Sequence, residues 1–170
     1  MQDKGVNELV EAFEIVHETN PLTHLVLVGN FERHLDPLKA ETERVIENHP
    51  NIHAVGYKSN VVDYFAIADV FTFPSYREGF PNAVMQAASM QLNCIVSNIN
   101  GCNEIIQDGK NGLIIPPKNV EKLRNKMEWC IHNKKESKIM GLESRDIIQI
   151  NYERQYVWNQ ILKEYKSVYN

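Results

Sequence analysis

The chain has 170 residues and a mass of 19.6 kDa, a size that predicts a single domain able to fold alone. Its 43% hydrophobic and 24% charged residues exclude a disordered tail, a collagen-like repeat and a coiled coil. The formal net charge of −4 provides no basic stripe for nucleic acid, so no nucleic-acid partner is expected. No apolar run approaches the roughly 20 residues that cross a bilayer. The N-terminus also lacks the apolar core of a signal peptide, so a soluble, cytoplasmic protein is predicted.

Predicted helices and strands alternate along the chain. Val6, Leu9 and Phe13 recur at the spacing of an amphipathic helix over 6–17. The apolar run 25–28 is typical of a strand that is buried on both faces. Further strands are predicted at 52–55, 69–74, 94–96 and 112–115, and further helices at 37–48, 61–67, 81–90, 103–107, 119–133 and, with breaks, 137–169. This alternation predicts an α/β fold with a doubly wound parallel sheet of about five strands.

Several common chemical sites are excluded because their motifs are absent. The sequence has no G-x-G-x-x-G or Walker A phosphate loop, no D-x-D pair for a divalent metal and no G-x-S-x-G serine elbow. The histidines show no metal-ligand spacing, since Pro50 prevents His49 and His53 from sharing a helical face. The three cysteines have unrelated spacings and are expected to be reduced thiols. No metal site is therefore expected.

The stretch 73–87 suggests a binding site. A hydrophobic strand ends at Pro74, the polar loop after it presents Glu78, and Gly79 permits close backbone approach. Pro81 suits the first turn of the next helix. Free backbone amides and a positive helix end would then face the carboxyl edge of the sheet beside one carboxylate, where a ligand with hydroxyls and negative charge fits. An ordinary strand, loop and helix with a solvated Glu explains the same spacing equally well.

The string from Glu78 to Gln86 resembles the E-x7-E signature of retaining glycosyltransferases of family 4, the glycosyl transferases group 1. Further pieces resemble the family in its own order, among them the KG turn at 4–5 and the DGxNG turn at 108–112. Together they span about residues 3–165 and resemble the Rossmann-like, nucleotide-sugar-binding C-terminal domain of a GT-B enzyme. The resemblance implies a donor-binding domain at 1–150, with a C-terminal helix of the same domain at 151–170.

The resemblance also implies roles for individual residues. Lys4 would contact the donor diphosphate and neutralise the charge that builds on the leaving phosphate. Glu78 would accept hydrogen bonds from hydroxyls of the donor sugar, and these two are the expected catalytic residues. The nucleobase would lie near Tyr57 and Lys58, and amides of 80–83 would hold sugar and phosphate. The residues expected to bind the donor are Tyr57, Lys58, Gly79, Phe80, Pro81, Asn82, Ala83 and Gln86. No metal is implied, and no cofactor besides the nucleotide diphosphate sugar, which is the donor substrate.

Two departures from the family pattern affect these expectations. Gln86 stands where the family carries a second Glu that binds both ribose hydroxyls. The chain also begins at Met1 without the first strand of the family's domain, its Gly-Arg pair, or the N-terminal acceptor-binding domain. It therefore looks like the excised donor half of a two-domain enzyme. Because the absent strand is central in the family's order, its gap is expected to close by re-pairing or by association with a neighbouring chain.

The function implied is that of a retaining, metal-independent glycosyltransferase. It would move a sugar from a nucleotide diphosphate sugar to a glycan or lipid acceptor, as in polysaccharide biosynthesis. The acceptor would bind through the absent N-terminal domain, so the isolated chain is expected to be inactive. Peripheral membrane association of the parent enzyme and homo-association of the fragment are further expectations about partners.

Two alternatives and one structural question stay open. An inactive transferase-like module that binds nucleotide sugars is supported by Gln86 alone, and a GT-B nucleotide-sugar epimerase is disfavoured by the EGFPN and DGxNG strings. The apolar helical spacing of 152–169 is compatible with packing on its own domain or with a face left partly uncovered.

Overall fold

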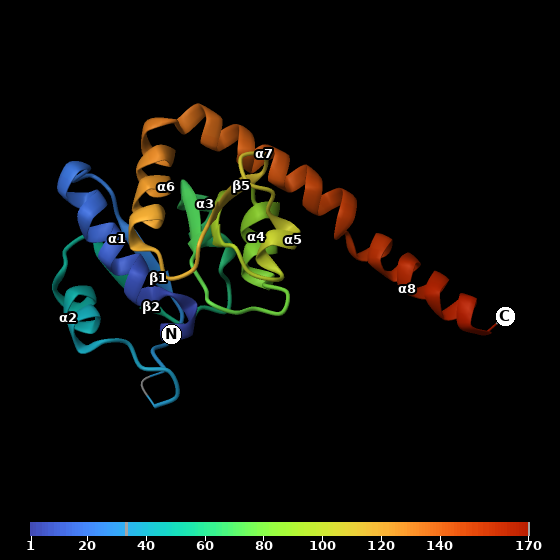
Figure 1. The fold of residues 1–170 in the computed structure, drawn as a ribbon, viewed down its shortest axis with the longest axis horizontal. Coiled ribbons are helices and arrows are strands. Elements are labelled where there is room, and N and C mark those ends of the chain that lie inside the picture. Colours follow the sequence, from blue (N-terminus) through green and yellow to red (C-terminus); the bar gives the residue numbers. More distant parts are fainter. Residues whose placement is uncertain (33, 170) are drawn as a thin grey trace.

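Strands alternate with helices over residues 6–132, and the chain from there to residue 169 is helical (Figure 1). The computed structural model describes residues 1–32 and 34–169. Its five strands all pair in parallel, which confirms the α/β prediction. The elements are a 3₁₀ helix η1 (Gln2–Lys4), then α1 (Val6–Thr19), β1 (Leu25–Val28), α2 (Ala40–Asn48), β2 (Ile52–Gly56), α3 (Val62–Ile67), β3 (Val70–Phe73), α4 (Asn82–Ser89), β4 (Asn93–Ser97), α5 (Cys102–Ile105), β5 (Gly112–Ile115), α6 (Val120–His132), α7 (Lys134–Asn151) and α8 (Arg154–Tyr169).

The strands form two separate sheets. One has the order β1-β2 and the other the order β3-β4-β5, so β1 and β3 do not pair with each other in the described part of the chain. The expected re-pairing across the gap is therefore wrong. Helix α1 explains why, because its apolar face packs in one core with Leu27 of the first sheet and with Ile95 and Leu113 of the second. Helix α1 thus packs against both sheets and lies between their facing parts of the core.

The two sheets differ in how they are covered. In the three-stranded sheet, Ile95 packs toward α1 and α6, while Cys94 and Val96 pack in a second core with α4 and α5. In the two-stranded sheet, Leu27 shares one core with α1 and α2, but Val26 and Val28 on the opposite face are each 39% exposed. The prediction that 25–28 is buried on both faces is therefore wrong for one face.

Association of the chain with itself stays a prediction, and the free strand edges give it a physical basis. Unpaired N–H and C=O groups on β1 and β3 can pair with another chain. We expect light scattering to show dimers or larger species as concentration rises. A Val26→Lys variant should shift this equilibrium toward monomer, because a charged edge resists pairing. A monomer at high concentration for the unmodified chain would contradict the prediction.

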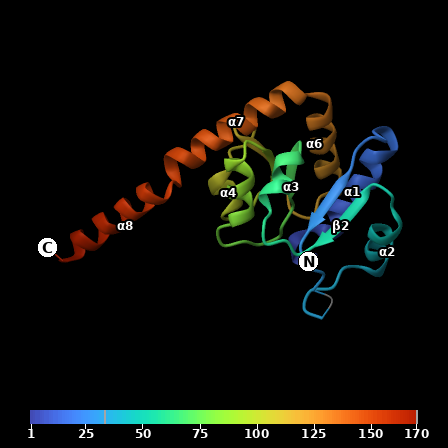
Figure 2. The same ribbon diagram turned by 180° about the vertical axis from the view of Figure 1, so that it is seen from behind.

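The C-terminal third is helical, and its last helix leaves the body of the molecule (Figure 2). The predicted helix 137–169 is two helices, with a break at 152–153. Helix α8 makes its main contacts with α7, and Tyr156, Trp158 and Leu162 are about half exposed. The expectation of a partly uncovered face is thus confirmed for α8, whereas Tyr152 at the start of the segment packs on the domain. Among the described residues, no helix combines the length and apolarity needed to cross a membrane.

Candidate active site

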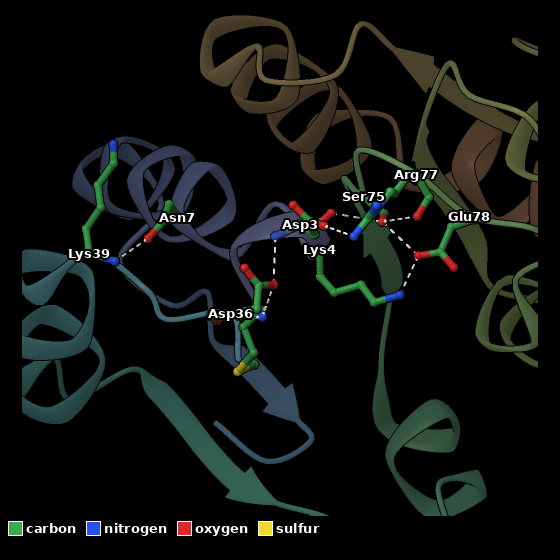
Figure 3. A network of polar contacts seen from close by, with 9 residues as sticks. Asp3, Lys4, Asn7, Asp36, Lys39, Ser75, Arg77 and Glu78 are labelled. Carbon is green, nitrogen blue, oxygen red and sulfur yellow. Dashed lines mark hydrogen bonds and ion pairs between the residues drawn. The ribbon is translucent and has the colours of Figure 1, made fainter. Parts of the chain in front are cut away.

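Lys4 and Glu78, the two expected catalytic residues, meet although they lie far apart in sequence. Lys4 is the last residue of η1, and Glu78 lies in the loop after β3. The Lys4 Nζ donates to Glu78 Oε1 at 2.6 Å (Figure 3). The Glu78 side chain is only 13% exposed, whereas that of Lys4 is 52% exposed. The pair therefore presents an accessible ammonium group beside a largely covered carboxylate.

Ser75 and the backbone around it fix the position of Glu78. The Ser75 hydroxyl is buried and lies 2.7 Å from Glu78 Oε1, to which it can donate. The Tyr76 amide donates to the Asp3 carbonyl oxygen at 2.8 Å, and Arg77 forms an ion pair with the Asp3 carboxylate at 2.8 Å. These contacts join the loop after β3 to the 3₁₀ helix that carries the lysine (Figure 3).

Two glycines allow the backbone segments of the site to approach each other. Gly5 has φ +70°, and a Cβ there would lie 2.1 Å from the Pro74 carbonyl oxygen. Gly101 has φ +77°, and a Cβ there would lie 2.2 Å from the Gly79 carbonyl oxygen. The backbone of Gly101 therefore approaches that of Gly79 closely, and only Gly101 must lack a side chain for this contact. A Cβ on Gly79 itself would meet nothing within 4 Å. Close approach of a ligand to the backbone at Gly79 stays a prediction.

The start of α4 supplies the predicted amides. The helix begins at Asn82 and Pro81 is its N-cap, with φ −78° and ψ 105°, so Pro81 precedes the first turn instead of lying in it. Proline has no N–H, and Pro81 can contribute only shape. The amides of Asn82 and Ala83 are in the first turn, where no intrahelical acceptor exists. Phe80, which is 41% exposed, lies in the loop just before them.

The remaining expected donor-binding residues fall into two places. Gln86 is exposed on α4, one helical turn after Asn82 and on the same face. Tyr57 and Lys58 follow β2 in the other sheet, and both are exposed, Tyr57 by 71%. The Tyr57 amide donates to Asn30 Oδ1 at 3.0 Å, which fixes the backbone of that loop but not the ring.

The thiol nearest to the site is not a reactive one. Burial, and secondly the charge of Glu78, raise the pKa of Cys102 to about 12, although Lys4 opposes this. All three cysteines are free and buried. Among the described residues, no group of three His, Cys, Asp or Glu side chains is placed to hold a metal ion.

Sequence reasoning missed the residues that support the site. Ser75 stood in a recognised string, but nothing in its spacing indicated a bond to Glu78. The Asp3–Arg77 ion pair joins residues in different elements, and no local pattern signals it. Gly101 lies two residues before the short helix predicted at 103–107, a position that did not indicate its close contact with Gly79.

A family model described as glycosyl transferases group 1 matches residues 2–146. A curated relative is 30% identical over 166 residues, 97% of this chain and 42% of its own length. It is the N,N'-diacetylbacillosaminyl-diphospho-undecaprenol alpha-1,3-N-acetylgalactosaminyltransferase of Campylobacter jejuni. The chain spans less than half the length of the curated relatives that it matches.

Solved structures show the same fold at low sequence identity. Anabaena HepE in complex with UDP-glucose superposes with a TM-score of 0.86 at 18% identity, covering 98% of this chain and 46% of that one. The C-terminal domain of a glycosyl transferase group 1 family protein, LpcC, from Francisella tularensis gives a TM-score of 0.81 at 22% identity. That match covers 91% of this chain and 82% of the Francisella chain.

Proposed function

Because the chain belongs to the glycosyl transferases group 1 family, we propose that it is the donor-binding half of a retaining glycosyltransferase. The whole enzyme would move a sugar from a nucleotide diphosphate sugar to a glycan or lipid acceptor. The observation that carries the proposal is the Lys4–Glu78 pair, which lies in the loops at the carboxyl edge of the second sheet. Ligands of open α/β sheets bind at this edge.

The chemistry of the pair suits a diphosphate leaving group. The ammonium of Lys4 has three protons and donates one to Glu78, so the others remain available to a phosphate. A fixed positive charge where negative charge develops lowers the barrier to departure of the nucleotide diphosphate. The first-turn amides of α4 add further donors and the positive end of a helix. We propose that these groups stabilise the leaving diphosphate without a metal ion.

Glu78 is suited to hold the sugar and not to attack it. Its Oε1 already accepts from Lys4 and from Ser75, so this oxygen is occupied by donors of the protein itself. The second carboxylate oxygen can accept hydrogen bonds from sugar hydroxyls, and such charge-assisted bonds are about twice as strong as neutral ones. The acceptor would be bound by a further domain. The C. jejuni relative is named for a diphospho-undecaprenol acceptor, which supports a lipid-linked acceptor as one of the two proposed classes.

Binding of nucleotide sugars tests the proposal directly. Calorimetry of the 170-residue chain with UDP-, GDP- and ADP-glucose should show weak binding of at least one, and the HepE complex makes UDP-glucose the first to try. A Glu78→Gln variant should lose most of that binding, while hydrolysis and transfer by the isolated chain should be absent. Binding that is unchanged by Glu78→Gln, or robust turnover by the isolated chain, would contradict the proposal.

The alternative of an inactive binding module depends on Gln86. An amide offers one acceptor oxygen and no charge where a carboxylate would bind two hydroxyls. Gln86→Glu should therefore tighten nucleotide binding by about 5- to 30-fold, measured by calorimetry. Gln160→Glu, which adds the same charge on exposed α8, is the matched control and should leave the affinity unchanged. Equal or weaker binding by the Gln86 variant would show that this residue does not contact the ribose.

Transfer assays separate the enzyme from the inactive module. The chain would be joined to an N-terminal domain from a group 1 relative and assayed with the sugar nucleotide that binds. Transfer by this hybrid would support the proposal that the chain is part of an active glycosyltransferase. Transfer that appears only after Gln86→Glu supports the module that has lost activity.

A further inference from the structure

Tyr152, at the end of α7, contacts both α5 and the loop between Glu78 and α4, which we call the donor loop. Its ring lies 5.3 Å from the ring of Phe80, centroid to centroid, at an angle of 54°. Its hydroxyl donates to the carbonyl oxygen of Glu104 at 2.9 Å. Phe80 belongs to the loop between Glu78 and α4, and Glu104 belongs to α5. One side chain from the C-terminal helices therefore touches the loop and the helix beside it.

The contact with Glu104 continues to the backbone of the donor loop. The Glu104 carboxylate accepts from the Gly101 amide at 3.1 Å, which fixes the turn before α5. Gly101 in turn lies so close to the Gly79 carbonyl oxygen that a Cβ there would be 2.2 Å away. The turn therefore packs against the backbone of Gly79, the residue next to Glu78, and limits its movement toward α5.

Helix α7 is well placed to hold Tyr152 still. Gly141 lets α7 lie directly on the loop before β4, because a Cβ there would be 2.1 Å from the Gln91 carbonyl oxygen. Arg145 Nη1 donates to the Ser89 carbonyl oxygen at 2.9 Å, at the end of α4. Tyr152 then ends α7, where its own amide donates to the Ile148 carbonyl oxygen at 2.9 Å.

We infer that Tyr152 is a positioning residue for the donor site, an inference that rests on the proposed function. Its ring limits the movement of Phe80, and its hydroxyl holds the turn that supports Gly79. Tyr152 is also the C-cap of α7, and α8 begins two residues later at Arg154. The side chain that supports the donor site therefore lies at the junction between α7 and α8.

Two variants at Tyr152 separate its contacts. The probe is the glucose nucleotide that binds the unmodified chain most tightly. Tyr152→Ala removes the ring contact and the hydrogen bond, and should weaken binding of this probe by roughly 10-fold. Tyr152→Phe keeps the ring and should weaken it by about 3-fold or less. Tyr156→Ala removes a ring of α8 that is 46% exposed, and serves as the matched control with unchanged affinity.

Hydrogen exchange without any ligand gives a second readout that does not depend on the proposed function. In Tyr152→Ala the amides of Gly101, Val84 and Met85, which are hydrogen-bonded around the loop, should exchange roughly 10-fold faster. The amide of Leu9 in α1 should be unaffected. If the unmodified chain binds no nucleotide sugar, the proposed function fails, and these exchange rates still decide the role of Tyr152.

Two results would overturn the inference. One is unchanged local exchange together with unchanged affinity in Tyr152→Ala. The other is equal acceleration at Leu9 and at the loop amides, because it indicates a general loss of stability and no specific positioning. If Tyr152→Ala does not fold, the near-isosteric Tyr152→Phe supplies the same comparison for the hydrogen bond, and unchanged loop exchange in that variant overturns the inference.

Discussion

Replacing Lys4 with methionine should weaken nucleotide-sugar binding by about 10- to 100-fold, because a charged hydrogen bond to phosphate is lost. The substitution also leaves the Glu78 carboxylate, 13% exposed, without its cationic partner. An uncompensated negative charge would then lie beside the position that we propose for the phosphates. The free energy of unfolding should fall by only about 1 kcal/mol or less, since Lys4 is half exposed and its pair is screened by solvent.

A double variant separates the two causes of that loss. If Lys4 serves only to neutralise Glu78, Lys4→Met/Glu78→Gln should bind as well as Glu78→Gln alone. If Lys4 contacts the diphosphate, as we propose, the double variant should bind several-fold more weakly than Glu78→Gln alone. Lys138→Met removes the same charge from an exposed position on α7 and controls for net charge. Equal calorimetric affinities of Lys4→Met and the unmodified chain would contradict the proposed role.

The sequence predicted the elements well because their signals are local. The apolar run 25–28 and the spacing of Val6, Leu9 and Phe13 each determine one element from neighbouring residues. The exposure of Val26 could not be foreseen in this way. It depends on α1 and α2 both packing on the other face of the two-stranded sheet, which is a property of the whole fold.

The sequence predicted the residues that would carry out the chemistry of the site, but it did not predict the residues that hold them in place. The family resemblance identified Lys4 and Glu78 separately, and the structure brings them to 2.6 Å. Ser75 and Tyr152 were not predicted, because each acts through a contact with a distant element. The need for a glycine at Gly101 was not foreseen either, because it arises from the close approach of the Gly79 carbonyl oxygen, which belongs to a distant segment of the chain.

Substituting Gly5 with alanine should have the largest effect on stability of the changes considered. A residue with a Cβ at φ +70° costs roughly 1–2 kcal/mol in backbone energy. The new Cβ would also lie 2.1 Å from the Pro74 carbonyl oxygen, a contact that only a backbone shift can relieve, at a further cost of about 1–3 kcal/mol. Thermal unfolding should therefore occur roughly 5–15 °C lower, at about 2–4 °C per kcal/mol for a chain of this size.

Gly109→Ala separates the cost of the left-handed backbone conformation from the cost of the steric clash. Gly109 has nearly the same φ, +73°, but a Cβ there would meet nothing within 4 Å, so its variant should show only the smaller loss. The difference between the two unfolding temperatures then measures the packing of the Lys4–Gly5 turn against the end of β3. Because that packing also places Lys4 beside Glu78, Gly5→Ala should weaken nucleotide-sugar binding at temperatures where it is still folded, and Gly109→Ala should not. Equal unfolding temperatures for the two variants would mean that the turn moves without cost, in which case the position of Lys4 is set by its ion pair and not by the backbone.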